Sequence, residues 1–249
     1  MISPKKKHQQ IIEIAKQSIE HEANAIRDLS KYIDTDFAEI VEKIFLSKGR
    51  VIVTGIGKSA NIGNKIVATL NSTGTPAIFM HAADAIHGDL GIVQTDDIVI
   101  CISKSGNTPE IKVLVPLIKS RGNMLIGMVS NADSYLATNS DKVLLAKVDK
   151  EACPNNLAPT SSTTAQLVLG DALAIALIDY RDFSKDDFAQ FHPGGSLGKK
   201  LYLRVNDIYK NNPVPKAYEN TTIREVILEI SEKRLGATVI VDEYNKIKG

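Results

Sequence analysis

The sequence predicts an α/β protein: a doubly wound, mostly parallel five-stranded sheet flanked by helices. Two observations lead to this fold class. Short runs of branched apolar residues recur along the chain, as is typical of strands buried on both faces, and helical patterns separate them. Alternation of strands and helices requires crossover connections and therefore a parallel sheet. The five runs are residues 51–53, 77–79, 98–102, 124–129 and 143–145.

Helices are expected before, between and after these strands. From Ile11 to Leu29 apolar residues recur every three or four positions, which is one stripe of an amphipathic helix. The apolar stretch from Leu167 to Ile178 falls short of the ~20 residues that a membrane span needs, so no membrane-crossing segment is expected. The other expected helices are residues 37–46, 59–70, 82–87, 108–120, 134–138, 161–180 and 185–190.

The character of the sequence changes after Leu203, which divides the chain into predicted domains 1–203 and 204–249. Residues 211–215 read as a linker, residues 222–233 as a helix and residues 238–241 as a strand. One helix and one strand of this size cannot bury a core alone. The second domain is therefore expected to be incomplete.

Composition narrows the classes of partner. Of 249 residues, 30 are Lys or Arg and 29 are Asp or Glu, so the net charge is only +1 and nucleic acid is not an expected partner. The two cysteines, Cys101 and Cys153, have no metal-type spacing and fit a reducing compartment. No apolar stretch of a signal peptide follows the first lysines, and a cytoplasmic protein is expected.

The loop after the first strand, TGIGKS at residues 54–59, invites comparison with two nucleotide motifs. A P-loop would need glycine where the chain has Ile52. A dinucleotide fingerprint would need a third glycine or alanine, which Ala60 supplies, and an acidic residue after the second strand, where the chain has His81. NAD binding is therefore disfavoured.

The loop after the third strand, SKSGNTPE at residues 103–110, offers hydroxyl groups at the start of a helix. Such a helix N-terminus binds phosphate readily, and Pro109 suits a first helical turn. Capping by Ser105 or Thr108 is the structural alternative, but it needs only one hydroxyl group. We expect one phosphate pocket lined by Ser59, Ser103, Ser105 and Thr108.

These motifs carry a resemblance. GIGKS, SKSGNTPE and the Ser/Thr-rich stretch at residues 159–164 resemble the sugar isomerase (SIS) domain. The segments HGDLG (87–91), LAPTSSTTA (157–165) and HPGGSLG (192–198) more closely resemble the arabinose-5-phosphate isomerase family. The resemblance implies an aldose–ketose isomerase that interconverts D-ribulose 5-phosphate and D-arabinose 5-phosphate through an enediolate. It further implies a supply of Kdo for lipopolysaccharide or capsule, a homotetramer and no required cofactor.

The resemblance also implies site residues. It makes Lys58, Glu110, Glu151 and His192 catalytic, and we favour Glu151 over Glu110 as the base while leaving the choice open. His81 is also a possible ligand of an inhibitory zinc ion that catalysis does not require. The implied substrate-binding residues are Ser59, Gly74, Thr75, His81, His87, Ser103, Ser105 and Thr108.

Residues 213–249 are similar to the first half of a CBS motif, which the family carries in tandem behind the SIS domain. The chain ends before the first repeat is complete, so we expect an incomplete CBS motif that does not sense nucleotides as a CBS pair does.

Two other functions remain open. SIS domains also serve as sugar-phosphate-sensing modules of regulators, which carry a helix-turn-helix domain ahead of them, whereas only helix 11–29 and a short partner precede this sheet. An isomerase of another ketose phosphate would use the same motifs.

Overall fold

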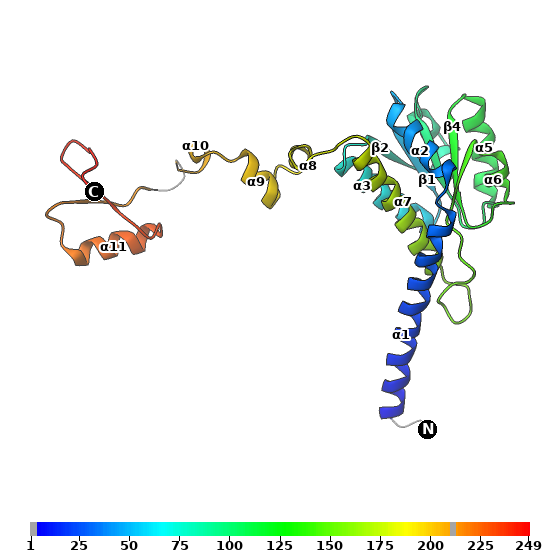
Figure 1. The fold of residues 1–249 in the computed structure, drawn as a ribbon, viewed down its shortest axis with the longest axis horizontal. Helices are drawn as coiled ribbons and strands as arrows, with labels where there is room; N and C mark the ends of the chain where they lie inside the picture. Colours follow the sequence, from blue (N-terminus) through cyan, green and yellow to red (C-terminus); the bar gives the residue numbers. More distant parts are fainter. Residues whose placement is uncertain (1–3, 210–212) are drawn as a thin grey trace. The chain divides into compact units, whose positions relative to one another are not determined.

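The computed structural model describes residues 4–209 and 213–249, which form two compact units. The larger unit ends at Phe191 and the smaller begins at His192 (Figure 1). The sequence places this boundary later, at residue 203, because it rests on a change in composition and not on contacts. Residues 211 and 212 of the expected linker lie outside the described residues.

The larger unit is built on one parallel sheet in the order β2-β1-β3-β4-β5, which confirms the five predicted strands. Gly55 at the end of β1 pairs with His81 of β2 and with Ile102 of β3, so the carboxyl ends of these strands are level. The chain leaves β1 in opposite directions toward β2 and β3, and ligands bind at such a switch point. The strands are β1 Val51–Gly55, β2 Ala77–His81, β3 Ile98–Ile102, β4 Met124–Val129 and β5 Lys142–Leu145.

Helices cover both faces of the sheet, as Figure 1 shows. Strand side chains alternate between two cores: Val53 faces the core shared with α2, α3 and α7, whereas Ile52 faces the core shared with α4, α5 and α6. Burial on both faces explains why the strands read as continuous apolar runs. The helices are α1 Pro4–Leu29, α2 Thr35–Leu46, α3 Lys58–Ser72, α4 Ala82–Ala85, α5 Pro109–Ser120, α6 Tyr135–Asn139, α7 Ser161–Tyr180 and α8 Lys185–Phe191, with 3₁₀ turns η1 Ser30–Tyr32 and η2 Asp89–Ile92.

Helix α7 is the most apolar helix of the larger unit. By length and composition alone it could cross a membrane, but half of it is buried within the protein, and a core helix passes the same test. Its Gly170 lets α3 approach closely, because a Cβ there would lie 2.4 Å from Ile66 Cδ1. The apolarity of α7 is thus accounted for by its packing between α1, α2 and α3.

The smaller unit contains α9 Ser196–Tyr202, α10 Val205–Ile208, β6 Lys216–Tyr218, α11 Ile223–Lys233 and β7 Val239–Val241. Strands β6 and β7 pair in parallel, and α11 connects them. The predicted helix 222–233 and strand 238–241 are confirmed by α11 and β7, whereas β6 was not expected. Thr222 and Glu225 form a capping box that fixes the start of α11.

Candidate active site

A cavity of about 260 Å³ lies where the carboxyl ends of β1 and β3 face the start of α7. It brings together the two loops in which the sequence predicts phosphate binding. Its lining residues are Ile56, Lys58, Ser59, Ile102, Ser103, Lys104, Ser105, Thr108, Pro159, Ser162, Thr163 and Gln166. The four hydroxyl residues expected in one pocket are all present.

Two glycines shape the loops around this cavity. Gly57, with φ +60°, caps α3 and turns the chain sharply between β1 and Lys58. Gly106, with φ +63°, has no room for a side chain, because a Cβ would lie 2.2 Å from Ser134 Oγ. The turn at Gly106 leads to Thr108, the N-cap of α5, and Pro109 occupies the first turn as expected.

The hydroxyl groups of the cavity differ in their partners. Ser103 Oγ accepts a hydrogen bond from Gly106 N (3.1 Å), and Ser105 Oγ accepts one from Asn107 N (3.3 Å). Ser59 Oγ donates to Gln166 Oε1 (3.2 Å). Thr108 Oγ1 is buried without a hydrogen-bond partner among the described residues. A buried hydroxyl group without a partner is costly, and an entering ligand oxygen would satisfy it.

The electrostatics of the cavity favour an anion. Three helices, α3, α5 and α7, begin beside it, and the N-terminus of a helix carries a partial positive charge. Lys58 and Lys104 add two ammonium groups, and neither Asp nor Glu is among the described residues that line the cavity. This combination of helix N-termini, hydroxyl groups and cations suits a phosphate.

Glu151 lies behind the cavity wall with its side chain fully buried. Its carboxylate accepts hydrogen bonds from Lys104 Nζ (2.6 Å), Ser162 Oγ and N, and Thr160 N and Oγ1. Burial alone would raise the pKa of Glu151, but the bonds from Lys104, Ser162 and Thr160 outweigh it and lower the pKa to about 2. Glu151 is therefore ionised at neutral pH.

Three other predicted residues lie at or after the carboxyl ends of β2 and β3 along the chain. Glu110 is half-buried in the first turn of α5, two residues after Thr108, and does not line the cavity. His81 ends β2 level with Gly55, and its Nδ1 lies 3.4 Å from Asp84 Oδ2. His87 follows α4 and is exposed.

A zinc site at His81 would need further ligands. Within residues 4–209 and 213–249, no group of three His, Cys, Asp or Glu side chains is arranged to hold a metal ion. Asp84 is the acidic side chain beside His81. Zinc binding at His81 remains a prediction.

Gly74 and Thr75 lie at the opposite end of the strands from the cavity. They precede β2 at Ala77, so they are beside the amino ends of the strands, away from the cavity. Arg181 Nη1 donates to Gly74 O (2.6 Å) and Arg181 Nη2 to Thr75 Oγ1 (2.8 Å). Within this chain the two residues connect the end of α7 to β2, and they do not line the cavity.

His192 belongs to the smaller unit. It begins a turn in which Gly195 N donates to His192 O (3.1 Å), just before α9. It therefore lies in a different unit from the cavity.

Sequence reasoning did not select Lys104, Ser162 or Gln166, which the structure brings to the cavity. Lys104 stands between two selected serines and is the cation of its loop. Ser162 and Gln166 are four residues apart on α7, and both are buried polar residues. That spacing puts them on one helix face and is the signal that identifies them.

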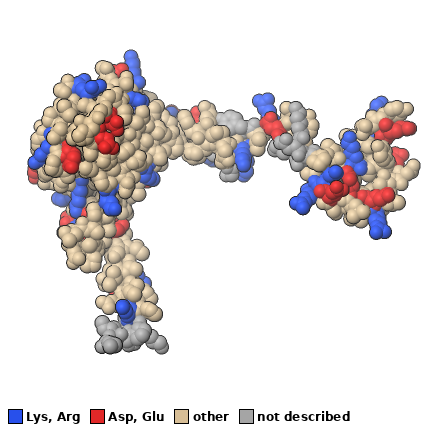
Figure 2. Space-filling model, turned by 180° about the vertical axis from the view of Figure 1, so that it is seen from behind, with Lys and Arg blue, Asp and Glu red and all other residues tan. Residues whose placement is uncertain are grey.

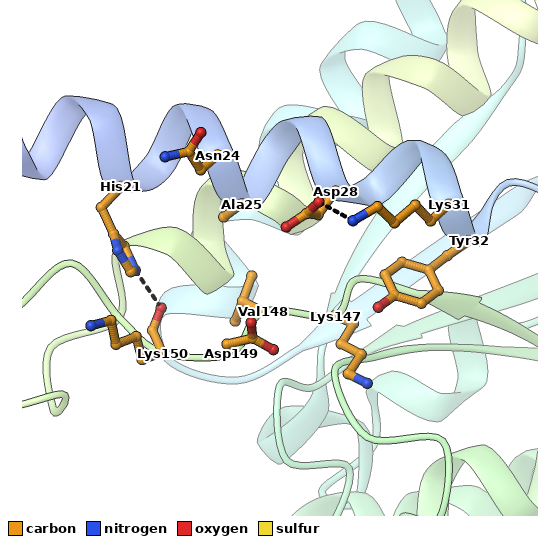
Figure 3. Close-up of a pocket in the computed structure, with 10 residues that line it drawn as sticks. All are labelled: His21, Asn24, Ala25, Asp28, Lys31, Tyr32, Lys147, Val148, Asp149 and Lys150. Carbon is orange, nitrogen blue, oxygen red and sulfur yellow. Dashed lines mark hydrogen bonds and ion pairs between the residues drawn. The ribbon is translucent and has the colours of Figure 1, made fainter.

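A second cavity of about 210 Å³ lies between α1 and residues 147–150 (Figure 3). His21 Nε2 is 3.0 Å from Lys150 O, and Lys31 pairs with Asp28. None of the predicted site residues lines this cavity. Its lining mixes acidic and basic side chains and lacks the serine and threonine hydroxyl groups of the first.

Comparisons with known proteins show the family of this chain. A family model of the SIS domain matches residues 44–176. The arabinose 5-phosphate isomerase KdsD of Pseudomonas aeruginosa is 48% identical over 96% of this chain and 73% of its own length. The same enzyme of Escherichia coli K12 is 47% identical over 94% of this chain and 72% of its own.

A solved structure extends the comparison to three dimensions. An Escherichia coli CFT073 protein in complex with arabinose 5-phosphate has a TM-score of 0.72 and 39% identity, and the match covers 74% of this chain and 98% of that one. The SIS match spans more than half of the chain, and the relatives are nearly half identical over most of their length. The chain belongs to the arabinose 5-phosphate isomerase family of SIS domain proteins.

Proposed function

We propose that this chain interconverts D-ribulose 5-phosphate and D-arabinose 5-phosphate and thereby supplies Kdo biosynthesis for lipopolysaccharide or capsule. The observation that carries the proposal is the phosphate cavity, in which Lys58 and four hydroxyl residues surround the start of α3 and α5. Relatives named for this activity and a similar structure that holds arabinose 5-phosphate support the choice of sugar.

Aldose–ketose isomerisation moves a proton between two adjacent carbons through an enediolate. A bound phosphate fixes the sugar in one register, which lowers the entropic part of the barrier. The Lys58 ammonium group, at the first residue of α3, is placed to stabilise the developing negative charge. His192 supplies an imidazole, which can donate or accept a proton at the sugar oxygens. No cofactor is required for these steps.

The base is a carboxylate, and the two candidates have different environments. Glu151 is buried, ionised and bonded by five donors, so it accepts a proton only after one of these bonds opens. Glu110 is half-buried in the first turn of α5. We keep Glu151 as the favoured base and Glu110 as the alternative. Glu151 can act only in a rearranged site, because in this arrangement its carboxylate is fully hydrogen-bonded and its pKa of about 2 makes it a weak base.

The variants E151Q and E110Q show which of the two glutamates is the base. The variant that lacks the base should lose about 10²–10⁴-fold in turnover and also stop exchanging the substrate C–H proton with D₂O. A Glu151→Gln variant that exchanges at the wild-type rate would remove Glu151 from proton transfer.

The activity itself is tested by adding ribulose 5-phosphate and identifying the product by NMR. Signals of arabinose 5-phosphate should appear and reach equilibrium with the ketose. K58M serves as the control for a contaminating isomerase. Formation of a different aldose phosphate would show that the chain acts on the same substrate with another stereochemistry, and no reaction would refute the proposal.

We further propose that the protein is a cytoplasmic homotetramer. Helix α1 supports assembly, because its isoleucines Ile11, Ile12, Ile14 and Ile19 are 47–71% exposed. Figure 2 shows acidic and basic side chains interspersed over the larger unit, which does not favour a nucleic-acid partner. Sedimentation at micromolar concentration tests the assembly, and an active monomer would contradict it.

The smaller unit is, in our proposal, an incomplete CBS motif. Its support is the parallel pair β6 and β7 joined by α11, a βαβ arrangement with a single helix. Titration with adenine nucleotides tests whether it binds them, and we expect no binding.

A further inference from the structure

Lys104 lines the cavity, but the hydroxyl motif of its loop gives it no role. It lies between Ser103 and Ser105, and its ammonium group pairs with Glu151 Oε1 at 2.6 Å. The Lys104 side chain is 42% exposed, whereas the Glu151 side chain is 0% exposed. The ion pair therefore spans the boundary between the protein interior and the open cavity.

The carboxylate itself is not available to a ligand in this arrangement. Oε1 accepts from Lys104 and Ser162 Oγ, and Oε2 accepts from Thr160 and from Ser162 N. An ionised carboxylate has about four lone-pair sites, so these bonds occupy it fully. The amides of Thr160 and Ser162 are thus taken by Glu151, and Glu151 does not line the cavity.

What faces the cavity in its place is Lys104. An ammonium group has three N–H donors, and the bond to Glu151 uses one of them. The remaining donors are on the side chain that lines the cavity together with Lys58. A phosphate ester carries close to two negative charges at neutral pH, and the remaining N–H donors of Lys104 can bind its oxygens alongside the hydroxyl groups of the cavity.

We propose that Lys104 is a substrate-binding residue whose ammonium group, held in place by buried Glu151, binds the phosphate of the sugar phosphate and leaves Lys58 to stabilise the charge that develops at the reacting carbons. The assignment of Lys104 to phosphate binding depends on the proposed function only in which sugar carries the phosphate. The binding of a phosphate group follows from the cavity itself. A purely structural Lys104 would instead only neutralise Glu151.

The experiment compares K104M, K104R and wild type. Inorganic phosphate is the probe, measured as a competitive inhibitor and by calorimetry, alongside KM and kcat for ribulose 5-phosphate. K104M should weaken phosphate binding and raise KM by about 10–100-fold, the loss of a charge-assisted hydrogen bond. Phosphate binding and KM are the readouts of this role, because Lys104 also holds Glu151 and its loss can change kcat by that route. K104R should recover part of the affinity because it keeps the charge.

K119M is the matched control. Lys119 also pairs with an acidic residue, Asp141, but at the other end of α5 from the cavity. Its loss should leave phosphate binding and both kinetic constants unchanged. An equal effect of K119M and K104M would show that general charge, and not the position of Lys104, is responsible, and would overturn the proposal.

K104M leaves a buried carboxylate without its cation, so stability could fall. The double variant K104M/E151Q removes both charges and is compared with E151Q alone. Phosphate should bind more weakly to the double variant than to E151Q. Equal binding by the two, or wild-type binding by K104M, would show that Lys104 serves only the fold. Calorimetry with phosphate decides this even if ribulose 5-phosphate proves not to be the substrate.

Discussion

The hydrogen bonds around Glu151 determine more than its charge at neutral pH. Burial of a carboxylate is unfavourable unless donors surround it, and here Lys104, Thr160 and Ser162 supply them. These donors come from the loop after β3 and the start of α7, which are far apart in the sequence. Glu151 thus joins two segments of the site, and its protonation should loosen that connection.

Stability should depend on pH through this group. The pKa of Glu151 is about 2 in the folded protein, below its ordinary value of 4.5. A lowered pKa contributes stability that is fully present above pH 4.5 and is lost as the pH falls toward 2. The shift corresponds to a contribution on the order of 3 kcal/mol. Urea unfolding of E151Q and wild type across this range should show a stability difference that shrinks with acidity; a constant difference would contradict the assignment.

Lys58 and His192 should affect turnover far more than stability. Lys58 is exposed at the start of α3, and His192 lies in a turn of the smaller unit. K58M and H192A should each lower kcat by about 10²–10⁴-fold, the range for a group that stabilises charge or moves a proton. His8→Ala, an exposed residue of α1, is the control. Wild-type turnover in either variant would remove that residue from the mechanism.

Among the secondary-structure elements, α3 and α7 both begin at the cavity and pack closely at Gly170. Lys58 and Ser59 come from α3, and Ser162 and Gln166 from α7. The space between the helices near Ile66 therefore helps to set the width of the site.

Gly170→Ala should separate the two helices. Its Cβ would lie 2.4 Å from Ile66 Cδ1, so the cost of overpacking, about 1–3 kcal/mol, should exceed the gain of about 1 kcal/mol in helix propensity. G170A should lower the melting temperature and raise KM. Adding I66A makes room for the new methyl group. The KM difference between G170A/I66A and I66A should therefore be smaller than the KM difference between G170A and wild type. A G170A variant with unchanged KM would separate the site from this contact.

The strands could be predicted because each contains an apolar run, which in the central strands β1, β3 and β4 is buried on both faces. The order of motifs placed Lys58 and Ser103 at neighbouring strand ends. Side-chain contacts between residues that are far apart in the sequence could not be predicted. The bond between Lys104 and Glu151 joins residues 47 positions apart. The position of Gly74 and Thr75, by contrast, could be predicted. They precede a predicted strand, so they lie at its amino end, away from the cavity. β6 was missed because three residues, Lys216–Tyr218, carry too little pattern.

The chain as a whole consists of two units with unequal cores. The larger unit buries apolar side chains on both faces of its sheet. In the described part of the smaller unit, the buried residues with apolar side chains are Pro215, Ala217 and Val241, and Ile223, Ile227 and Leu228 of α11 are 56–74% exposed. Burial on this scale contributes little against the ~1–2 kcal/mol of backbone entropy lost per ordered residue.

A chain ended at Tyr209 should therefore retain the fold and the activity of the full chain. It keeps the cavity, Glu151 and His192, and it removes β6, α11 and β7. The melting temperature of the larger unit and kcat/KM for ribulose 5-phosphate should stay close to the values of the full chain. As a matched control, a chain ended at Phe191 lacks His192 and should fold but lose turnover. Loss of activity in the chain ended at Tyr209 would show that the exposed face of α11 stabilises the site or the assembly.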